Sequence, residues 1–364
     1  MRYWCINVSA FEKLQKPERS ALDEFDAVID VRSPSEFEAD HIPRAINLPV
    51  LTDAERAEVG TIYVQDSRFE ARRLGAAYVS QNIGAHLLGE LANKPRDFRP
   101  LVYCWRGGMR SNSMATILSA IGWRGSVLEG GYQTWRRMVV SELREPGPNF
   151  NLIVLDGQTG SGKTRILELL SQQGVQTLDL EGLANHRGSV FGGFEDRPQP
   201  TQKMFESLVW DQLSEVDPAR PVVVEAESSL IGRISLPERL LQSMKVAKRI
   251  EVTATVAERA QFLCSAYSDM IACPERLTCA IERLRPFHAR DHVQHWLKLA
   301  ESAEFEMLAG ELMRHHYDPL YNKQRAKHRE VRLAEFAAKD LAIDGLSSVA
   351  AQIADFLEDV AALQ

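Results

Sequence analysis

Several features are scarce in this 364-residue sequence, and each scarcity excludes a class of protein. No apolar run approaches the ~20 residues that a membrane-spanning helix requires, and the opening MRYWCINVSAFEKL becomes charged too early for a secretory signal. We therefore expect a cytoplasmic protein with no membrane partner. The five cysteines include no C-x-x-C pair, which argues against a zinc ribbon or a thioredoxin site. Basic charge is also in deficit: a net charge of −7 argues against a wholly basic nucleic-acid coat, although not against a local basic patch.

What the sequence has in quantity is short apolar runs that alternate with helical patterns. The expected strands are 27–31, 100–104, 151–156, 175–180, 221–227 and 249–254. Apolar residues at helical spacing predict helices over 112–122, 163–174 and 201–215. This alternation predicts the α/β class with parallel sheets. The segment SELREPGPNF (141–150) is polar and holds two prolines, so we expect a linker there between a domain over 1–140 and a second domain over 151–364.

Cys104 ends an expected strand within the stretch YCWRGGMRS, residues 103–111. A helix is expected to follow at once, so the chain must turn tightly, and Gly107 and Gly108 tolerate the positive φ angles that such a turn uses. Backbone N–H groups that converge at a helix N-terminus attract negative charge, which favours the thiolate form of Cys104. The alternative interpretation is a small structural cysteine at the end of a strand.

Three stretches together resemble the rhodanese domain family over about residues 10–140. They are the Cys104 loop, AVIDVRSPSEFEADHIPRAINLP (27–49) and LEGGYQTWRR (128–137). The resemblance implies that Cys104 is a carrier of a persulfide. It also implies a mainly structural role for four signature residues: Asp30, Arg32, Glu36 and His41. The glycines usual beside the His-Ile pair are Asp40 and Arg44 here, a difference expected to affect only a turn.

Two arginines follow the cysteine, and their spacing suggests what the loop binds. Arg106 and Arg110 add fixed positive charge that can hold an anionic ligand. Many single-domain rhodaneses have C-x4-R, whereas Cys104 and Arg110 have the C-x5-R spacing of the related dual-specificity phosphatases, whose pocket admits a tetrahedral phosphate. We therefore expect a donor that brings phosphate with the transferred atom, and phosphate should compete with that donor.

The second domain opens with a phosphate-binding motif. The expected strand NLIVLD runs into GQTGSGKT (157–164) and then into a helix, which is the strand–loop–helix context of a P-loop. The expected diphosphate-binding residues are Gly157, Gly160, Ser161, Gly162, Lys163 and Thr164. Thr164 can ligate Mg²⁺, and Glu225 or Glu227 in VVVEAES is a candidate to hold its water shell. A strand-end acid that only faces solvent explains these glutamates equally well. We see no catalytic base or arginine finger, so phosphate binding is better supported than nucleotide hydrolysis, and no tightly bound metal or cofactor is expected.

A basic segment near the C-terminal end, RHHYDPLYNKQRAKHREVR (314–332), interleaves cations with tyrosines and histidines. This pattern suits a surface that follows a nucleic-acid backbone and stacks on bases, and a solvated helix face explains it equally well. The candidate tRNA-binding residues are Arg314, Lys323, Arg325, Lys327 and Arg329.

A rhodanese domain followed by a P-loop domain narrows the field further. The chain resembles the tRNA 2-selenouridine synthase family in the Cys104 loop, residues 60–83, the P-loop, RGSVFGG (187–193) with PQPTQKMFE, and EAESSLIG (225–232). The resemblance implies replacement of sulfur by selenium in wobble 2-thiouridine of tRNA, through an S-geranylated intermediate. It also implies selenophosphate and geranyl diphosphate as co-substrates, with Cys104 holding selenium as a selenylsulfide. An enzyme that supplies selenophosphate is a further expected partner.

Three alternatives stay open at this point. The chain could be a rhodanese-type sulfurtransferase fused to a P-loop kinase without an RNA substrate, which ATP turnover on a small molecule would favour. Cys104 could instead be a phosphatase nucleophile, which aryl phosphate hydrolysis lost on Cys104→Ser would reveal. Both loops could also only sense anions, and retained biological activity of Cys104→Ala would support that interpretation.

Overall fold

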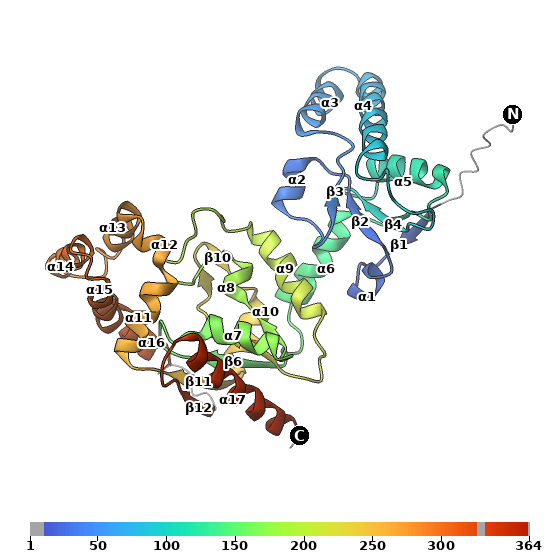
Figure 1. The fold of residues 1–364 in the computed structure, drawn as a ribbon. Helices are drawn as coiled ribbons and strands as arrows, with labels where there is room; N and C mark the ends of the chain where they lie inside the picture. Colours follow the sequence, from blue (N-terminus) through green and yellow to red (C-terminus); the bar gives the residue numbers. More distant parts are fainter. Residues whose placement is uncertain (1–10, 326–331, 363–364) are drawn as a thin grey trace. The chain divides into compact units, whose positions relative to one another are not determined.

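The computed structural model describes residues 11–325 and 332–362, and the chain divides into two compact units (Figure 1). Unit 1 comprises Met1–Leu143 with Pro200–Glu215, and unit 2 comprises Arg144–Gln199 with Val216–Gln364. Each unit contains a five-stranded sheet whose strands are all parallel, so the predicted α/β fold class is confirmed. Within the described residues, no helix combines the length and the apolar character that a membrane span needs.

The sheet of unit 1 has the strand order β1-β5-β4-β2-β3. Its strands are β1 (Glu12–Leu14), β2 (Ala27–Asp30), β3 (Ile46–Asn47), β4 (Pro100–Tyr103) and β5 (Ser126–Leu128). Its helices are α1 (Arg19–Leu22), α2 (Pro34–Ala39), α3 (Asp53–Gln65), α4 (Arg68–Leu88), α5 (Met109–Ile121) and α6 (Tyr132–Arg144), with α9 (Gln202–Ser214) added from later in the chain. Ile29 and Val102 of the central strands are fully buried together with Met114 and Leu118 of α5. The strands predicted at 27–31 and 100–104 are present as β2 and β4, whereas β1, β3 and β5 are too short to give a periodic signal.

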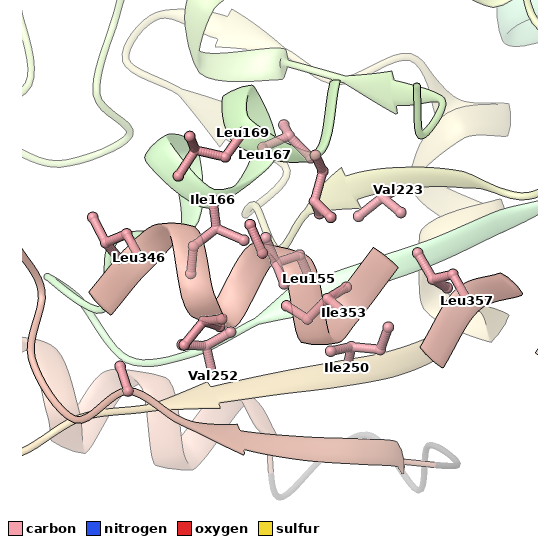
Figure 2. Close-up of a cluster of buried hydrophobic side chains, with 14 of the residues drawn as sticks. Leu155, Ile166, Leu167, Leu169, Val223, Ile250, Val252, Leu346, Ile353 and Leu357 are labelled. Atoms are coloured by element: carbon pink, nitrogen blue, oxygen red, sulfur yellow. The ribbon is translucent and has the colours of Figure 1, made fainter. Parts of the chain in front are cut away.

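The sheet of unit 2 has the order β12-β11-β6-β8-β7. Its strands are β6 (Leu152–Asp156), β7 (Thr177–Leu178), β8 (Val222–Glu225), β11 (Lys248–Thr253) and β12 (Arg332–Ala337), and β9 (Leu230–Ile231) with β10 (Ile234–Ser235) forms a separate antiparallel pair. Its helices are α7 (Lys163–Gln172), α8 (Leu180–Leu183), α10 (Glu238–Val246), α11 (Val256–Ala266), α12 (Ser268–Ile271), α13 (Pro274–Glu282), α14 (Arg290–Glu301), α15 (Phe305–Leu312), the π-helical turn η1 (Met313–Tyr317), α16 (Asp318–Arg325) and α17 (Ile343–Ala362). Leu155 of β6 and Ile250 and Val252 of β11 share a buried cluster with Leu346 and Ile353 of α17 (Figure 2). This core fixes the strand ends from which the P-loop emerges.

Helix α9 departs from the expected domain organisation. It follows β7 and α8 of unit 2 in the chain, yet Pro200–Glu215 belongs to unit 1. Trp210 of α9 is buried and meets the ring of Trp135 in α6 edge-on, with centroids 4.8 Å apart. The indole N–H of Trp135 also donates to Ser207 of α9 at 3.2 Å. The expectation of one continuous domain over 151–364 is therefore corrected, because the apolar face of α9 is buried in unit 1.

Asp40 and Arg44, which stand where the rhodanese signature usually has glycine, both contact helix α9 or its C-cap residue. Asp40 is buried, and its carboxylate accepts hydrogen bonds from the Tyr132 hydroxyl at 2.7 Å and from the Ser207 hydroxyl at 2.8 Å. Burial raises the pKa of Asp40, although these two hydrogen bonds oppose the rise. Arg44 pairs with Glu215, the residue that ends α9. The expectation that Asp40 and Arg44 affect only a turn is therefore wrong, since both attach α9 to unit 1.

Candidate functional site

The Cys104 loop joins β4 to α5 in unit 1, as the sequence predicts. Cys104 is 3% exposed, and its Sγ accepts a hydrogen bond from the Gly108 N–H at 3.3 Å. The Ser111 hydroxyl lies 3.2 Å from the same sulfur, a contact that sequence reasoning missed. Gly107 has φ of +64°, and a Cβ there would lie 2.8 Å from the carbonyl oxygen of Leu128, so only glycine fits the turn. An amide and a hydroxyl thus converge on the sulfur.

The two arginines of this loop have different surroundings. Arg110 Nη1 donates to Glu36 Oε2 at 2.8 Å, and Arg56 Nε approaches the same oxygen at 3.3 Å. Burial opposes ionisation of Glu36, but the hydrogen bond and charge of Arg110, with the charge of Arg56, lower its pKa below the ordinary value. Arg106 is exposed and has no ion pair with another described residue. Arg106 therefore offers an unbalanced charge to an anion, whereas Arg110 is held by a glutamate that the sequence marked as structural.

A buried ion pair supports the Cys104 loop from inside unit 1. Arg32 Nη2 donates to Asp30 Oδ2 at 2.6 Å, and both residues are almost fully buried. The guanidinium of Arg32 lies 4.1 Å from the ring centre of Tyr132. The backbone N–H of Tyr132 in turn donates to the carbonyl oxygen of Cys104 at 2.8 Å. The signature residues Asp30 and Arg32 thus hold the residue that anchors the cysteine.

The P-loop connects β6 to α7 in unit 2 and lines a cavity of about 850 Å³ with both polar and apolar walls, called the polar cavity below because it contains the P-loop and its carboxylates. Its six predicted residues all lie in this wall: Gly157, Gly160, Ser161, Gly162, Lys163 and Thr164. Lys163 Nζ donates to the carbonyl oxygen of Gly157 at 2.8 Å. The Ser161 hydroxyl is buried and has no hydrogen-bond partner among the described residues. The loop therefore keeps polar groups available for a phosphate ligand.

Three carboxylates gather beside the P-loop threonine. Oxygens of Glu181, Glu225 and Glu227 lie within 4.8 Å of one another. The Thr164 hydroxyl lies 3.0 Å from both Glu181 Oε2 and Glu225 Oε2. The structure thus unites both predicted glutamates and adds Glu181, which sequence reasoning missed although it follows the predicted strand at 175–180.

Burial first, and the charge of neighbouring acids second, favour the protonated forms of these glutamates. Burial, followed by the charge of Glu227, raises the pKa of Glu181 to about 8. Burial and the charge of Glu225 raise the pKa of Glu227 to about 7, and burial with the charges of Glu181 and Asp179 also raises that of Glu225. Carboxylate and hydroxyl oxygens are the ligands that Mg²⁺ takes in proteins, so this donor set fits that ion.

A second cavity, almost entirely apolar, adjoins the polar one. Its walls include aliphatic and aromatic side chains such as Phe191, Met270, Leu277, Leu308 and Leu312. The residues that line both cavities are Thr159, Ser189, Leu263, Tyr267 and Tyr317. Sequence reasoning had no signal for this feature, because its walls come from α11, α12, α13, α15, η1 and the loop after α8. A ligand could place a charged end on the P-loop and an apolar chain in this cavity.

The candidate tRNA-binding cations are only partly within the described chain. Arg314 of η1 and Lys323 of α16 are exposed, as a phosphate-contacting residue must be. Arg325 is the last residue of α16, and Lys327 and Arg329 lie outside the described residues. A role for these cations in binding tRNA stays a prediction.

The tyrosines of the same segment lie beside the cavities of unit 2. Tyr317 lines both cavities, and the Tyr321 hydroxyl donates to Asp156 Oδ1 at 3.0 Å, at the start of the P-loop. His316 is also buried, and its Nδ1 lies 2.9 Å from His288 Nε2. These side chains take part in contacts within unit 2, and the stacking of bases on them stays a prediction.

The two sites define a class of protein in which a rhodanese-like unit and a P-loop unit share one chain. The family model of the rhodanese-like domain matches residues 12–138, and that of the tRNA 2-selenouridine synthase AAA domain matches residues 150–276. A rhodanese-related protein of Thermoplasma volcanium aligns with 34% of this chain and 93% of its own, with 22% identity and a TM-score of 0.22.

Curated relatives extend the match across both units. The tRNA 2-selenouridine synthase of Nitrosomonas europaea is 36% identical over 236 residues, which is 64% of this chain and 61% of that protein. The tRNA 2-selenouridine synthase of a Sulfurovum species is 34% identical over 275 residues, 74% of this chain and 71% of that protein. The chain thus belongs to the tRNA 2-selenouridine synthase family, and it spans about three fifths of the length of the Nitrosomonas relative.

Proposed function

We propose that this protein replaces sulfur by selenium in wobble 2-thiouridine of tRNA, with geranyl diphosphate and selenophosphate as co-substrates. The observation that carries the proposal is the apolar cavity that shares its walls with the P-loop pocket. A nucleotide would satisfy the P-loop alone, whereas an isoprenoid diphosphate has a charged end for the loop and an apolar chain for the cavity. The relatives named as tRNA 2-selenouridine synthases support tRNA as the substrate.

In the first step the thiocarbonyl sulfur attacks C1 of geranyl diphosphate. The C1–O bond breaks and its electron pair leaves with the diphosphate. Lys163 and the P-loop amides bind the departing charge, which grows in the transition state. Thr164, Glu181, Glu225 and Glu227 would hold Mg²⁺, which neutralises diphosphate charge when bound. The apolar cavity keeps the geranyl chain away from water.

In the second step selenide attacks C2 of the base, the C2–S bond breaks, and the S-geranyl group leaves with the electron pair as geranylthiolate, which is protonated to geranylthiol. Alkylation is needed first because a thiocarbonyl sulfur is a poor leaving group, whereas a thiol is a good one. Arg106 and the Gly108 amide suit the phosphate of selenophosphate, beside the sulfur of Cys104. Selenophosphate holds selenium at the selenide level, so loading of Cys104 as a selenylsulfide breaks the P–Se bond, releases phosphate and requires a disulfide oxidant that accepts two electrons. Release of the selenium as selenide then requires a thiol reductant that returns two electrons. Cys104 is thus required for selenation and dispensable for geranylation.

The test is mass analysis of tRNA nucleosides after incubation with geranyl diphosphate and selenophosphate. The wild type should form 2-selenouridine, and Lys163→Ala should form neither the geranylated nor the selenated nucleoside. Cys104→Ala should accumulate the geranylated nucleoside without selenium. Ser111→Ala is the control for the loop, since it removes a contact to the sulfur but leaves the nucleophile.

Two outcomes would contradict the proposal. A wild type that turns over ATP on a small molecule and leaves tRNA unchanged would favour the sulfurtransferase–kinase alternative. Full selenouridine formation by Cys104→Ala would remove the role given to the cysteine while leaving the geranylation step standing.

A further inference from the structure

Arg187 opens the loop 187–193, whose sequence is RGSVFGG, and its side chain has no role in the function described so far. The loop is tightly folded: the Arg187 N–H donates to the carbonyl oxygen of Gly192 at 3.0 Å. Gly188 has φ of +67°, and a Cβ there would lie 2.5 Å from Glu181 Oε1 and 3.0 Å from Glu227 Oε1. Only glycine therefore lets the loop backbone approach the carboxylate cluster this closely. The loop is built against the P-loop site.

The side chain of Arg187 forms part of the wall of the polar cavity that also contains the P-loop. Its guanidinium lies 4.2 Å from the ring centre of Phe194 and 4.8 Å from that of Tyr267. Nη2 donates to Asp269 Oδ1 at 2.9 Å, whereas Nη1 is buried and has no hydrogen-bond partner among the described residues. Phe194, Tyr267 and Asp269 thus hold the Arg187 guanidinium in the cavity wall. Its Nη1 group remains available to donate a hydrogen bond to a ligand.

The position of Arg187 relates to both cavities. Tyr267, on which the guanidinium packs, lines the polar and the apolar cavity, and so does Ser189 of the same loop. The hydroxyls of Ser189 and Tyr267 lie 3.0 Å apart, so the loop and the ring are joined at this junction. A ligand with its diphosphate on the P-loop and its chain in the apolar cavity has its C1–O bond at this junction.

We propose that Arg187 binds the diphosphate beside the bond that breaks and stabilises the negative charge of the leaving group. The inference rests on the proposed function, which it deepens by adding a second cation to Lys163. As the C1–O bond breaks, its electron pair moves to the bridging oxygen, and a fixed guanidinium is favoured there because it needs no reorganisation. Arg187 thus takes the part of an arginine finger, for which the sequence alone indicated no candidate.

The experiment compares Arg187→Ala, Arg187→Lys and Arg276→Ala in the full chain. Arg276 is the matched control: it approaches the same Asp269 at 3.9 Å and donates to the Gly193 carbonyl, but it lines neither cavity within the described residues. Single-turnover geranylation of 2-thiouridine tRNA gives the rate of the chemical step. Titration with inorganic pyrophosphate, followed by calorimetry, gives the affinity of the P-loop cavity for the leaving group.

We expect Arg187→Ala to lower the geranylation rate about 10²–10³-fold, the loss typical of removing one preorganised donor. The loss should appear more in kcat than in KM for geranyl diphosphate, because the charge develops in the transition state. Arg187→Lys, which keeps the charge, should recover part of the rate, and Arg276→Ala should stay within about threefold of the wild type. Pyrophosphate should bind Arg187→Ala more weakly than it binds Arg276→Ala.

A rate and a pyrophosphate affinity for Arg187→Ala equal to those of Arg276→Ala would overturn the inference. Equal losses in Arg187→Ala and Arg276→Ala would overturn it too, because they would show that the loop matters only for structure. If the wild type does not geranylate tRNA, the proposed function fails, and pyrophosphate binding still tests whether Arg187 contacts the ligand.

Discussion

The two units each present a glycine-containing loop between a parallel strand and a helix, but the charges around the loops are opposite in kind. Beside Cys104, Glu36 is paired with Arg110 and Arg56, and these cations lower its pKa. Beside the P-loop, the half-buried Glu181 and Glu227 lie next to the buried Glu225, and the pKa values of all three are raised. The first loop is therefore prepared to receive an anion without further help. The second carries repelling carboxylates that call for a cation to accompany the anion.

The loops also differ in what holds them in place. The P-loop is braced by elements of its own unit: Arg259 of α11 donates to the Thr159 carbonyl at 3.0 Å. The Cys104 loop is anchored by Tyr132, whose hydroxyl bonds to Asp40, and Asp40 accepts a second bond from Ser207 of α9. Since α9 comes from within the P-loop part of the sequence, the environment of the cysteine depends on a segment outside the rhodanese-like stretch.

Removal of divalent cations should give the largest difference between the activity at the P-loop and the activity at the Cys104 loop. We expect a chelator to lower geranylation about 10²–10³-fold, because the diphosphate then meets uncompensated carboxylates. Transfer of radioactive selenium to Cys104 should be unchanged, since the positive charge of Arg106 serves that loop without a metal ion. Glu225→Gln with saturating Mg²⁺ should resemble chelation, and Glu301→Gln, an exposed residue of α14, is the control. An equal loss at both loops on chelation would contradict the difference in charge.

A smaller effect is expected in the pH dependence of the stability of unit 2. Because the folded state favours the protonated form of Glu181, the folded chain binds more protons than the unfolded chain between the ordinary value of 4.5 and about 8. Without Mg²⁺, the free energy of unfolding should therefore fall as the pH rises through this window and level off above it. The melting temperature should fall about 2–4 °C for each kcal/mol lost, as followed by calorimetry.

Added Mg²⁺ should restore the melting temperature more at pH 8.5 than at pH 5.5, because the ion binds the ionised carboxylates. Glu181→Gln should flatten the pH dependence, whereas Glu301→Gln should leave it as in the wild type. A melting temperature that rises from pH 5.5 to 8.5 without Mg²⁺ would show that these glutamates do not repel one another as the geometry indicates.

Whether a site is built from neighbouring residues or from residues far apart in the sequence also explains which features the sequence could predict. The Cys104 loop and the P-loop are contiguous motifs at strand ends, so residue types and spacing sufficed to find both. Glu181 and Arg187 were missed because their approach to the P-loop depends on how the chain after β7 folds back. Asp40 and Ser207 lie 167 positions apart, and no local pattern indicates that they share a hydrogen bond. The apolar cavity was equally invisible, because its walls come from several helices.

The smallest expected effect tests the support that α9 gives to the Cys104 loop. Ser207→Ala removes the hydrogen bond to the buried Asp40 and the bond that Ser207 accepts from the Trp135 indole, and should lower the free energy of unfolding by about 1–3 kcal/mol. Ser214→Ala is the matched control, because among the described residues its hydroxyl bonds only to the carbonyl oxygen of Asp211 within the same helix. Hydrogen exchange should show faster opening of the Tyr132 amide, which holds Cys104, in Ser207→Ala than in Ser214→Ala.

A double-mutant cycle with Asp40→Asn then tests whether the loss of stability in Ser207→Ala comes from the Ser207–Asp40 hydrogen bond or from a general change in packing. If Ser207 acts through Asp40, the two substitutions together should cost clearly less than the sum of their separate effects. Additive losses, or equal exchange of the Tyr132 amide in both serine variants, would mean that α9 is only packed against unit 1 and does not reach the cysteine. The two loops would then differ in their charge alone, and each would be held by its own part of the sequence.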